Sequence, residues 1–176
     1  MKIERERVRE TFREYTDAYD ATDEKIKLKI DHTYRVAELC ERIAKAERME
    51  KTEVDLAWLL GMLHDVGRFE QLRRYGTFSD ADSIDHAALG TDILFGGPLS
   101  AGKGLIRTYV DDAAEDEVIE TAIRVHSAYR IPEGLVPRME KLCHILRDAD
   151  KIDILRVNVD VPLEEIYGVV SFYSQF

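Results

Sequence analysis

The sequence predicts an all-α fold, a single-domain helical bundle with a metal site at its centre. Two observations predict it. Apolar residues recur at helical spacing along most of the 176 residues, and histidines and aspartates interrupt those apolar stripes. Burying so many polar side chains is unfavourable unless something bonds or ligates them, and divalent cations would do so.

The first two helices follow from apolar spacing and from a cap. We expect the first over about residues 4–19, with its apolar residues on one side. The second starts after a Thr22-Asp23 cap and continues to about Arg48. Its apolar face includes a histidine and consists of Leu28, His32, Val36, Leu39 and Ile43.

The third helix is apolar nearly all round, which indicates the buried centre of the domain. It is expected to begin at Thr52, whose hydroxyl can cap it, with Asp55 at the third following position. It stops near Gly67. The stretch Gly67–Asp82 has an aromatic and basic character, and we interpret it as a loop.

Three further helices and one short one complete the chain. They are expected over about residues 83–95, 115–127 and 138–157, with the short one ending at Val110. Between them lies a glycine-rich connection, in which Gly97 to Lys103 reads G-x-x-x-x-G-K. Gly104 stands where a phosphate-binding loop needs Ser or Thr, and no strand precedes it, so we interpret it as a turn.

Composition narrows the class of protein. The formal net charge of −10 argues against a nucleic-acid scaffold and against an anionic membrane surface. It leaves room for a small phosphorylated substrate, because bound cations reverse the local sign. No apolar run approaches the ~20 residues of a membrane helix. Cys40 and Cys143 lie inside expected helices, which favours a reducing, cytoplasmic location over a disulfide framework.

Six polar residues stand on the apolar stripes of five expected helices, and their types suit metal binding. Imidazoles bind Fe, Ni, Zn or Co, and carboxylates extend the range to Mn and Mg. The six are His32, His64, Asp65, His86, His126 and Asp150. The two oxygens of Asp65 can bridge two cations. His144 has charged neighbours at helical spacing, so we exclude it from the site.

Each of these residues also has a simpler explanation. A lone histidine on an apolar stripe is more often a satisfied core residue, and Asp150 alone could pair with a buried lysine. Asp65 alone could be an irregular helix end, although an acid is unfavourable there. The whole set is harder to explain in this way, because several independent exceptions would have to coincide in one small domain.

The ordered set His32, His64-Asp65, Asp150 resembles the H…HD…D pattern of the HD-domain metal-dependent phosphohydrolases. The strings IDHTYRVAEL, LLGMLHDVGRFEQ, SIDHAALG, AIRVHS and RDADKIDIL carry the similarity over about residues 25–157. The resemblance implies a helical bundle with the metals in its middle. It implies one metal on His32, His64, Asp65 and Asp150, and a second on Asp65, His86 and His126.

The same resemblance suggests residues that contact substrate. Arg68 would hold a phosphate, although a helix C-terminal cation is an equal alternative. Lys151 would bind phosphate or protonate a leaving group, or is simply solvated. Arg73 and Arg74, with Tyr75 and Phe78, would form a lid that grips a nucleotide, or a surface loop.

Two departures limit the resemblance. The chain lacks the GYP segment of the cyclic-di-GMP phosphodiesterases and the Glu-Asp motif of guanosine-tetraphosphate hydrolases. Residues 158–176 are atypical of the family, although we count residues 1–176 as one domain.

The expected function is hydrolysis of a phosphoester in a nucleotide or small organophosphate, a monoester or a diester, by a metal-bound hydroxide. One or two divalent ions would serve, from among Mn, Fe, Ni, Co, Zn and Mg. The alternative is a non-catalytic HD module that binds a ligand and signals. The sequence leaves a homo-oligomer open.

Overall fold

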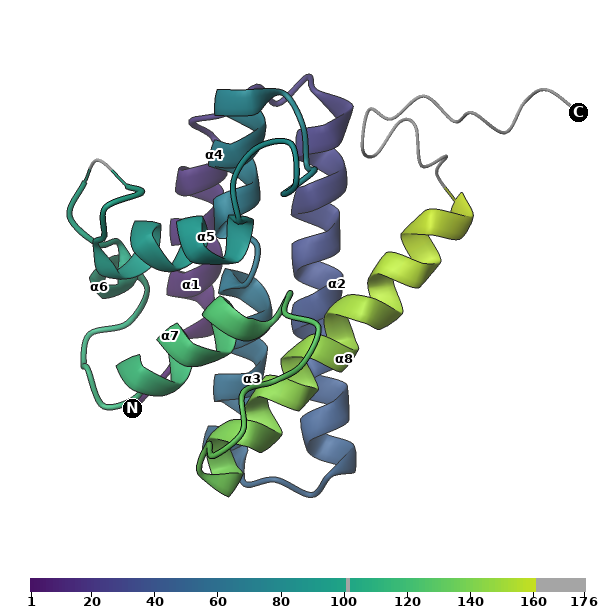
Figure 1. The fold of residues 1–176 in the computed structure, drawn as a ribbon. Coiled ribbons are helices and arrows are strands. Elements are labelled where there is room, and N and C mark those ends of the chain that lie inside the picture. Colours follow the sequence, from purple (N-terminus) through teal and green to yellow (C-terminus); the bar gives the residue numbers. More distant parts are fainter. Residues whose placement is uncertain (101, 161–176) are drawn as a thin grey trace, which may run out of the picture.

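The fold is all-α, as the sequence predicts. The computed structural model describes residues 1–100 and 102–160, and Figure 1 shows their arrangement. The helices are α1 (Arg5–Thr16), α2 (Glu24–Ala46), α3 (Lys51–Leu63), α4 (Val66–Tyr75), α5 (His86–Phe95), α6 (Ile106–Tyr109), α7 (Asp116–Val125) and α8 (Pro137–Asp160). These ranges contain no strand. Of the segment expected to be atypical, residues 161–176 lie outside the described part.

Helix α3 is the centre of the bundle, as its apolar composition predicts. Every residue from Leu56 to Leu63 is buried, and α1, α2, α7 and α8 all pack against the helix. Helix α8 crosses the long helix α2 obliquely (Figure 1). One continuous hydrophobic core joins residues from α1 to α8. None of the described helices is both long and apolar enough to cross a membrane.

The interpretation of Gly67–Asp82 as a loop is wrong over its first half. Val66–Tyr75 forms helix α4, which buries Phe69 and Leu72 one turn apart and ends at Gly76 with a left-handed φ of 70°. Ion pairs between the buried Glu70 and the arginines three and four positions later stabilise the last turns of the helix. The sequence did not predict this short helix because Gly67 is its second residue, and glycine usually weakens a helix.

The predicted start of α2 is confirmed, whereas α3 and α5 begin at other residues than predicted. The Asp23 carboxylate accepts a hydrogen bond from the Lys25 amide, as the cap predicts. The cap predicted at Thr52 is wrong, because α3 begins at Lys51 and its N-cap Glu50 makes no side-chain bond. Helix α5 begins at His86 and not near residue 83, because Asp85 caps it through two backbone amides.

Two glycines allow helices to approach closely beside the polar centre. A Cβ atom on Gly61 of α3 would lie 2.5 Å from Cα of Ala37 in α2. A Cβ on Gly67 of α4 would lie 2.1 Å from the carbonyl oxygen of His86 and 2.6 Å from the amide of Gly90 in α5. Because backbone atoms cannot yield as a flexible side chain can, these positions require glycine.

The Gly67→Ala variant is therefore expected to lose stability. Overpacking against backbone should cost about 3 kcal/mol or more, which lowers the melting temperature of a chain of this size by roughly 6–12 °C. Thermal unfolding followed by circular dichroism measures the effect. The matched control is Gly102→Ala, where an added Cβ meets no atom within 4 Å. Equal melting temperatures for the two variants would contradict the close α4–α5 approach.

Candidate metal centre

The six predicted ligands come together in the interior, and all are buried. His32 and Asp150 lie within α2 and α8, as expected. The other four residues were predicted to lie on the apolar stripes of helices, but the structure places them at helix ends. His64 is the C-cap of α3, Asp65 the N-cap of α4, His86 the first residue of α5 and His126 the C-cap of α7. Several helix ends therefore meet the middles of α2 and α8 at one point.

One group of donor atoms gathers around the Oδ2 atom of Asp65. The Nε2 atoms of His32 and His64 lie 3.6 Å and 3.5 Å from it. The same two nitrogens lie 3.2 Å and 3.7 Å from Oδ1 of Asp150. His32, His64 and Asp150 have donor atoms close enough together to hold one cation. We call these three residues and Oδ2 of Asp65 the first donor set.

A second group gathers around the other oxygen of the same carboxylate. The Nε2 atoms of His86 and His126 lie 3.5 Å and 3.7 Å from Oδ1 of Asp65, and 3.2 Å from each other. We call these two histidines and Oδ1 of Asp65 the second donor set. The two oxygens of Asp65 therefore face two different sets of imidazoles, which is the arrangement of a bridging carboxylate.

The tautomers of these histidines follow from what each Nδ1 atom contacts. In His64 and His126, Nδ1 lies 2.8 Å and 2.7 Å from the carbonyl oxygens of Gly61 and Ile123. A carbonyl only accepts, so each Nδ1 carries the proton and each Nε2 presents a lone pair to the centre.

The other two histidines are held in the same way by carboxylates. Nδ1 of His32 lies 2.7 Å from Asp153, and Nδ1 of His86 lies 2.6 Å from Asp80. Partners of this kind fix the ring orientation of metal-binding histidines. All four imidazoles therefore turn Nε2 toward the centre.

In the metal-free chain, the electrostatics protonate one of these rings and keep another neutral, so a metal that binds His64 would have to displace a proton from its Nε2. Burial disfavours a charge on His64, but the carboxylates of Asp65 and Asp150 outweigh it and raise the pKa of His64 to about 9. Burial lowers the pKa of His86 to about 4, which keeps that ring neutral. Burial opposes ionisation of Asp65, yet Lys29 and His64 hold the pKa of its carboxyl well below the usual range.

The donor atoms of these residues are of the kinds that bind a divalent metal. Neutral imidazoles of the assigned tautomers would point lone pairs at one another, 3.3 Å apart in His32 and His64 and 3.2 Å apart in His86 and His126. Such contacts are repulsive unless a proton or a cation lies between them. Nitrogen and carboxylate oxygen donors in these combinations suit first-row transition metals.

Two cationic residues border the carboxylate of Asp65. Lys29 Nζ lies 2.7 Å from Oδ2, and its side chain is 12% exposed. Nε of Arg68 lies 3.8 Å from Oδ1 and is buried without a hydrogen-bond partner among the described residues. The other end of Arg68 bonds Gln71, the Phe78 carbonyl and Asp80. Arg68 lies in the first turn of α4, so it is not a helix C-terminal cation.

The remaining predicted substrate residues lie apart from this centre or at its edge. Lys151 is 47% exposed, and its ammonium lies 2.8 Å from Oδ2 of Asp150. Arg73 and Arg74 lie on the last turn of α4, roughly 12 Å along the helix axis from Asp65. Both are paired with Glu70. Their assignment as substrate-binding residues stays a prediction.

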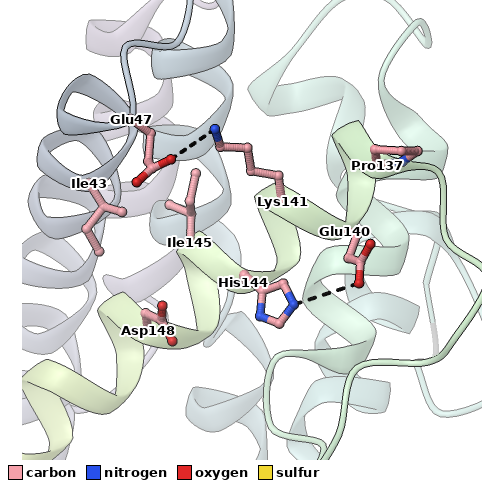
Figure 2. Close-up of a pocket in the computed structure, with 8 residues that line it drawn as sticks. All are labelled: Ile43, Glu47, Pro137, Glu140, Lys141, His144, Ile145 and Asp148. Carbon is pink, nitrogen blue, oxygen red and sulfur yellow. Dashed lines mark ion pairs between the residues drawn. The ribbon is translucent and has the colours of Figure 1, made fainter.

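His144 is separate from the centre, as predicted from its charged neighbours. It lies on the outer face of α8 in a surface pocket between α8 and the end of α2, shown in Figure 2. Its side chain is 55% exposed, and its nearest charged partner is Glu140 at 4.0 Å. It supplies a control for experiments on the buried histidines.

Sequence reasoning missed three charged residues of the site. Asp153 follows Asp150 by three positions and Lys29 precedes His32 by three, so helical spacing could have indicated both. Asp80 lies in the connection between α4 and α5, where no periodicity places a residue. All three act on the donor sets directly, through His32, Asp65 and His86.

The comparison with known families decides the identity of the fold. The model of the HD domain matches residues 30–155, which contain all six residues of the donor sets. The chain belongs to the HD-domain family. HD domains bind divalent metals, and the His and Asp clusters of this chain could hold one.

A solved structure is also similar to the chain. It is a predicted HD superfamily hydrolase from an uncultured Thermotogales bacterium, 29% identical in sequence, with a TM-score of 0.47. The match covers 88% of this chain and 72% of that one. A search of curated proteins found no match.

Proposed function

We propose that this HD-domain protein is a metal-dependent phosphohydrolase that cleaves a phosphoester in a nucleotide or a small organophosphate. The observation that carries the proposal is the pair of donor sets that share Asp65. We propose that each set holds one divalent cation. Two such ions supply an activated water and neutralise the charge that develops on a phosphoryl group.

The residues around Asp65 support an anionic substrate. Lys29 and Arg68 bring two positive charges to a centre whose protein ligands are otherwise carboxylates and imidazoles. The Nε–H of Arg68, which makes no hydrogen bond with the described residues, is a donor that supports contact with a phosphoryl oxygen. Lys151 lies at the exposed edge, beside Asp150, where its ammonium can hold a phosphate or protonate a departing oxygen. The two cysteines of the chain are buried and free, which supports a cytoplasmic enzyme.

Turnover of defined substrates tests this function. The purified chain is incubated with Mn²⁺ and a chromogenic phosphomonoester, a chromogenic phosphodiester and a panel of nucleotides. We expect hydrolysis of at least one class, unchanged in His144→Ala and lost in Asp65→Asn. Binding of a nucleotide without turnover, seen as a rise in melting temperature, would instead indicate the non-catalytic module.

We expect Lys29 to contribute to the turnover of substrate and not to the binding of metal. The Lys29→Met variant is expected to lose about 10- to 100-fold in kcat/KM, the range for one charge-assisted hydrogen bond. It should keep its metal, because Lys29 is not in either donor set. Lys29→Arg should recover part of the loss. Lys27→Met is the matched control, since that lysine is half exposed on the same helix and pairs with Glu24. Full activity in Lys29→Met would contradict this role.

A further inference from the structure

A surface pocket with three cationic side chains in its lining lies away from the metal centre. It has a volume of about 240 Å³ and is bordered by the end of α1, the last turns of α4 and the glycine-rich connection after α5. None of the six residues of the donor sets lines it. The connection is the segment whose G-x-x-x-x-G-K pattern has no role in the proposed hydrolysis.

The pocket is positively charged in a strongly acidic chain. Arg73, Arg74 and Lys103 line it, and Glu70 is the carboxylate among its lining residues. Glu70 is nearly buried and bonds both arginines, at 2.5 Å and 2.6 Å. One carboxylate cannot neutralise three cations, so the lining keeps an excess of two positive charges while the whole chain carries −10. Lys103 forms no ion pair with the described residues.

The shape of the pocket suits a small anion. Arg73 lies over the ring of Tyr19, 5.3 Å from its centroid, which holds the guanidinium at the rim. Gly102 also lines the pocket, and a Cβ there would meet no atom within 4 Å. A volume of about 240 Å³ is below the range of drug-sized ligand sites, and the three cationic side chains favour a small anion such as one with one or two phosphate groups.

Two tyrosine hydroxyls lie between the pocket and the start of α4. The hydroxyl of Tyr19 lies 3.3 Å from Glu70 and 3.0 Å from the hydroxyl of Tyr15, and its single proton can be donated to only one of them at a time. The Tyr15 hydroxyl donates to the carbonyl of Val66 at 2.8 Å. Val66 directly follows Asp65 in the sequence, and these contacts hold Tyr15 and Tyr19 at the border of the pocket.

From these observations we infer that the pocket between α1, α4 and residues 100 and 102–105 is a binding site for a small phosphate-bearing anion, separate from the metal centre. The site requires no metal. Its ligand is held by charge from Arg73, Arg74 and Lys103. The inference does not depend on the proposed hydrolysis, because the site would bind its anion whether or not the metal centre turns over.

Calorimetric titration with inorganic phosphate and with pyrophosphate tests the site, at about 0.15 M salt to screen weak surface attraction. Lys103→Glu is the main variant, because this lysine is exposed and unpaired. Arg73→Met is the second, since Arg74 still pairs with the nearly buried Glu70. Lys2→Glu is the control for charge alone, because Lys2 is 85% exposed at the N-terminus. Hydrogen exchange of the 97–105 segment, with and without phosphate, locates the binding.

We expect wild-type protein and Lys2→Glu to bind with equal affinity, Kd on the order of 1 mM or tighter, and phosphate to protect the 97–105 segment. Lys103→Glu and Arg73→Met should each bind at least about tenfold more weakly. A combined Asp65→Asn and Lys29→Met variant, which disables the metal centre, should bind as wild type does. Wild-type affinity in Lys103→Glu, loss of binding in the combined variant, or no binding by the wild type would each overturn the inference.

Discussion

Replacing Asp65 by asparagine is expected to remove at least about a thousandfold of the hydrolytic activity and to release metal from both donor sets. Asparagine keeps the size of the side chain but has one oxygen and no charge. It cannot present an anionic oxygen to His32 and His64 on one side and to His86 and His126 on the other. Electrostatic groups in a buried catalytic site commonly carry effects of this size.

A loss of folding must be separated from a loss of metal in this variant. Asp65 is the buried partner of Lys29, and removing one member of a buried ion pair costs about 3–5 kcal/mol. The combined variant Asp65→Asn with Lys29→Met removes both charges. It should recover most of the lost melting temperature and none of the metal or activity.

Elemental analysis and activity, measured on the same preparations, decide the prediction. His144→Ala removes an exposed imidazole and should match the wild type in both. If Asp65→Asn bound the wild-type amount of metal and turned over at the wild-type rate, Asp65 would not join the two sets.

Most residues of the metal centre could be predicted because they are polar residues at positions where a hydrophobic core needs apolar ones. His32 and Asp150 stand on apolar stripes of long helices, where helical spacing places a side chain reliably. The pairing of these residues with His64 and Asp65 came from the ordered pattern of the family, since spacing alone does not bring distant helices together. The buried central helix α3 followed from its composition.

The parts that were missed depend on contacts between distant segments. Helix α4 contains Gly67, which is tolerated because α5 packs against its bare backbone, and no local signal shows that contact. Helical spacing also cannot tell the last turn from the cap, so His64 and His126 were placed inside helices that end one residue earlier. Asp80 reaches His86 from a connection whose path follows from the fold as a whole.

The second large effect concerns the number of metal ions in each chain. Purified without chelator, the wild type is expected to hold two divalent ions, one in each donor set. His126→Ala leaves the second set with only His86 and one oxygen of Asp65, so we expect it to retain one ion and lose at least about 100-fold in activity. Asp150→Asn weakens the first set in the same way and should also hold one.

Elemental analysis combined with a Mn²⁺ titration tests both variants against His144→Ala. Their losses should not add when His126→Ala and Asp150→Asn are combined, because two ions that act together fail together when either is removed. Such a result would support a binuclear centre over two independent sites. One ion per wild-type chain, with full activity in His126→Ala, would instead leave the first set as the working site and His86 and His126 as buried core residues held by their Nδ1 bonds.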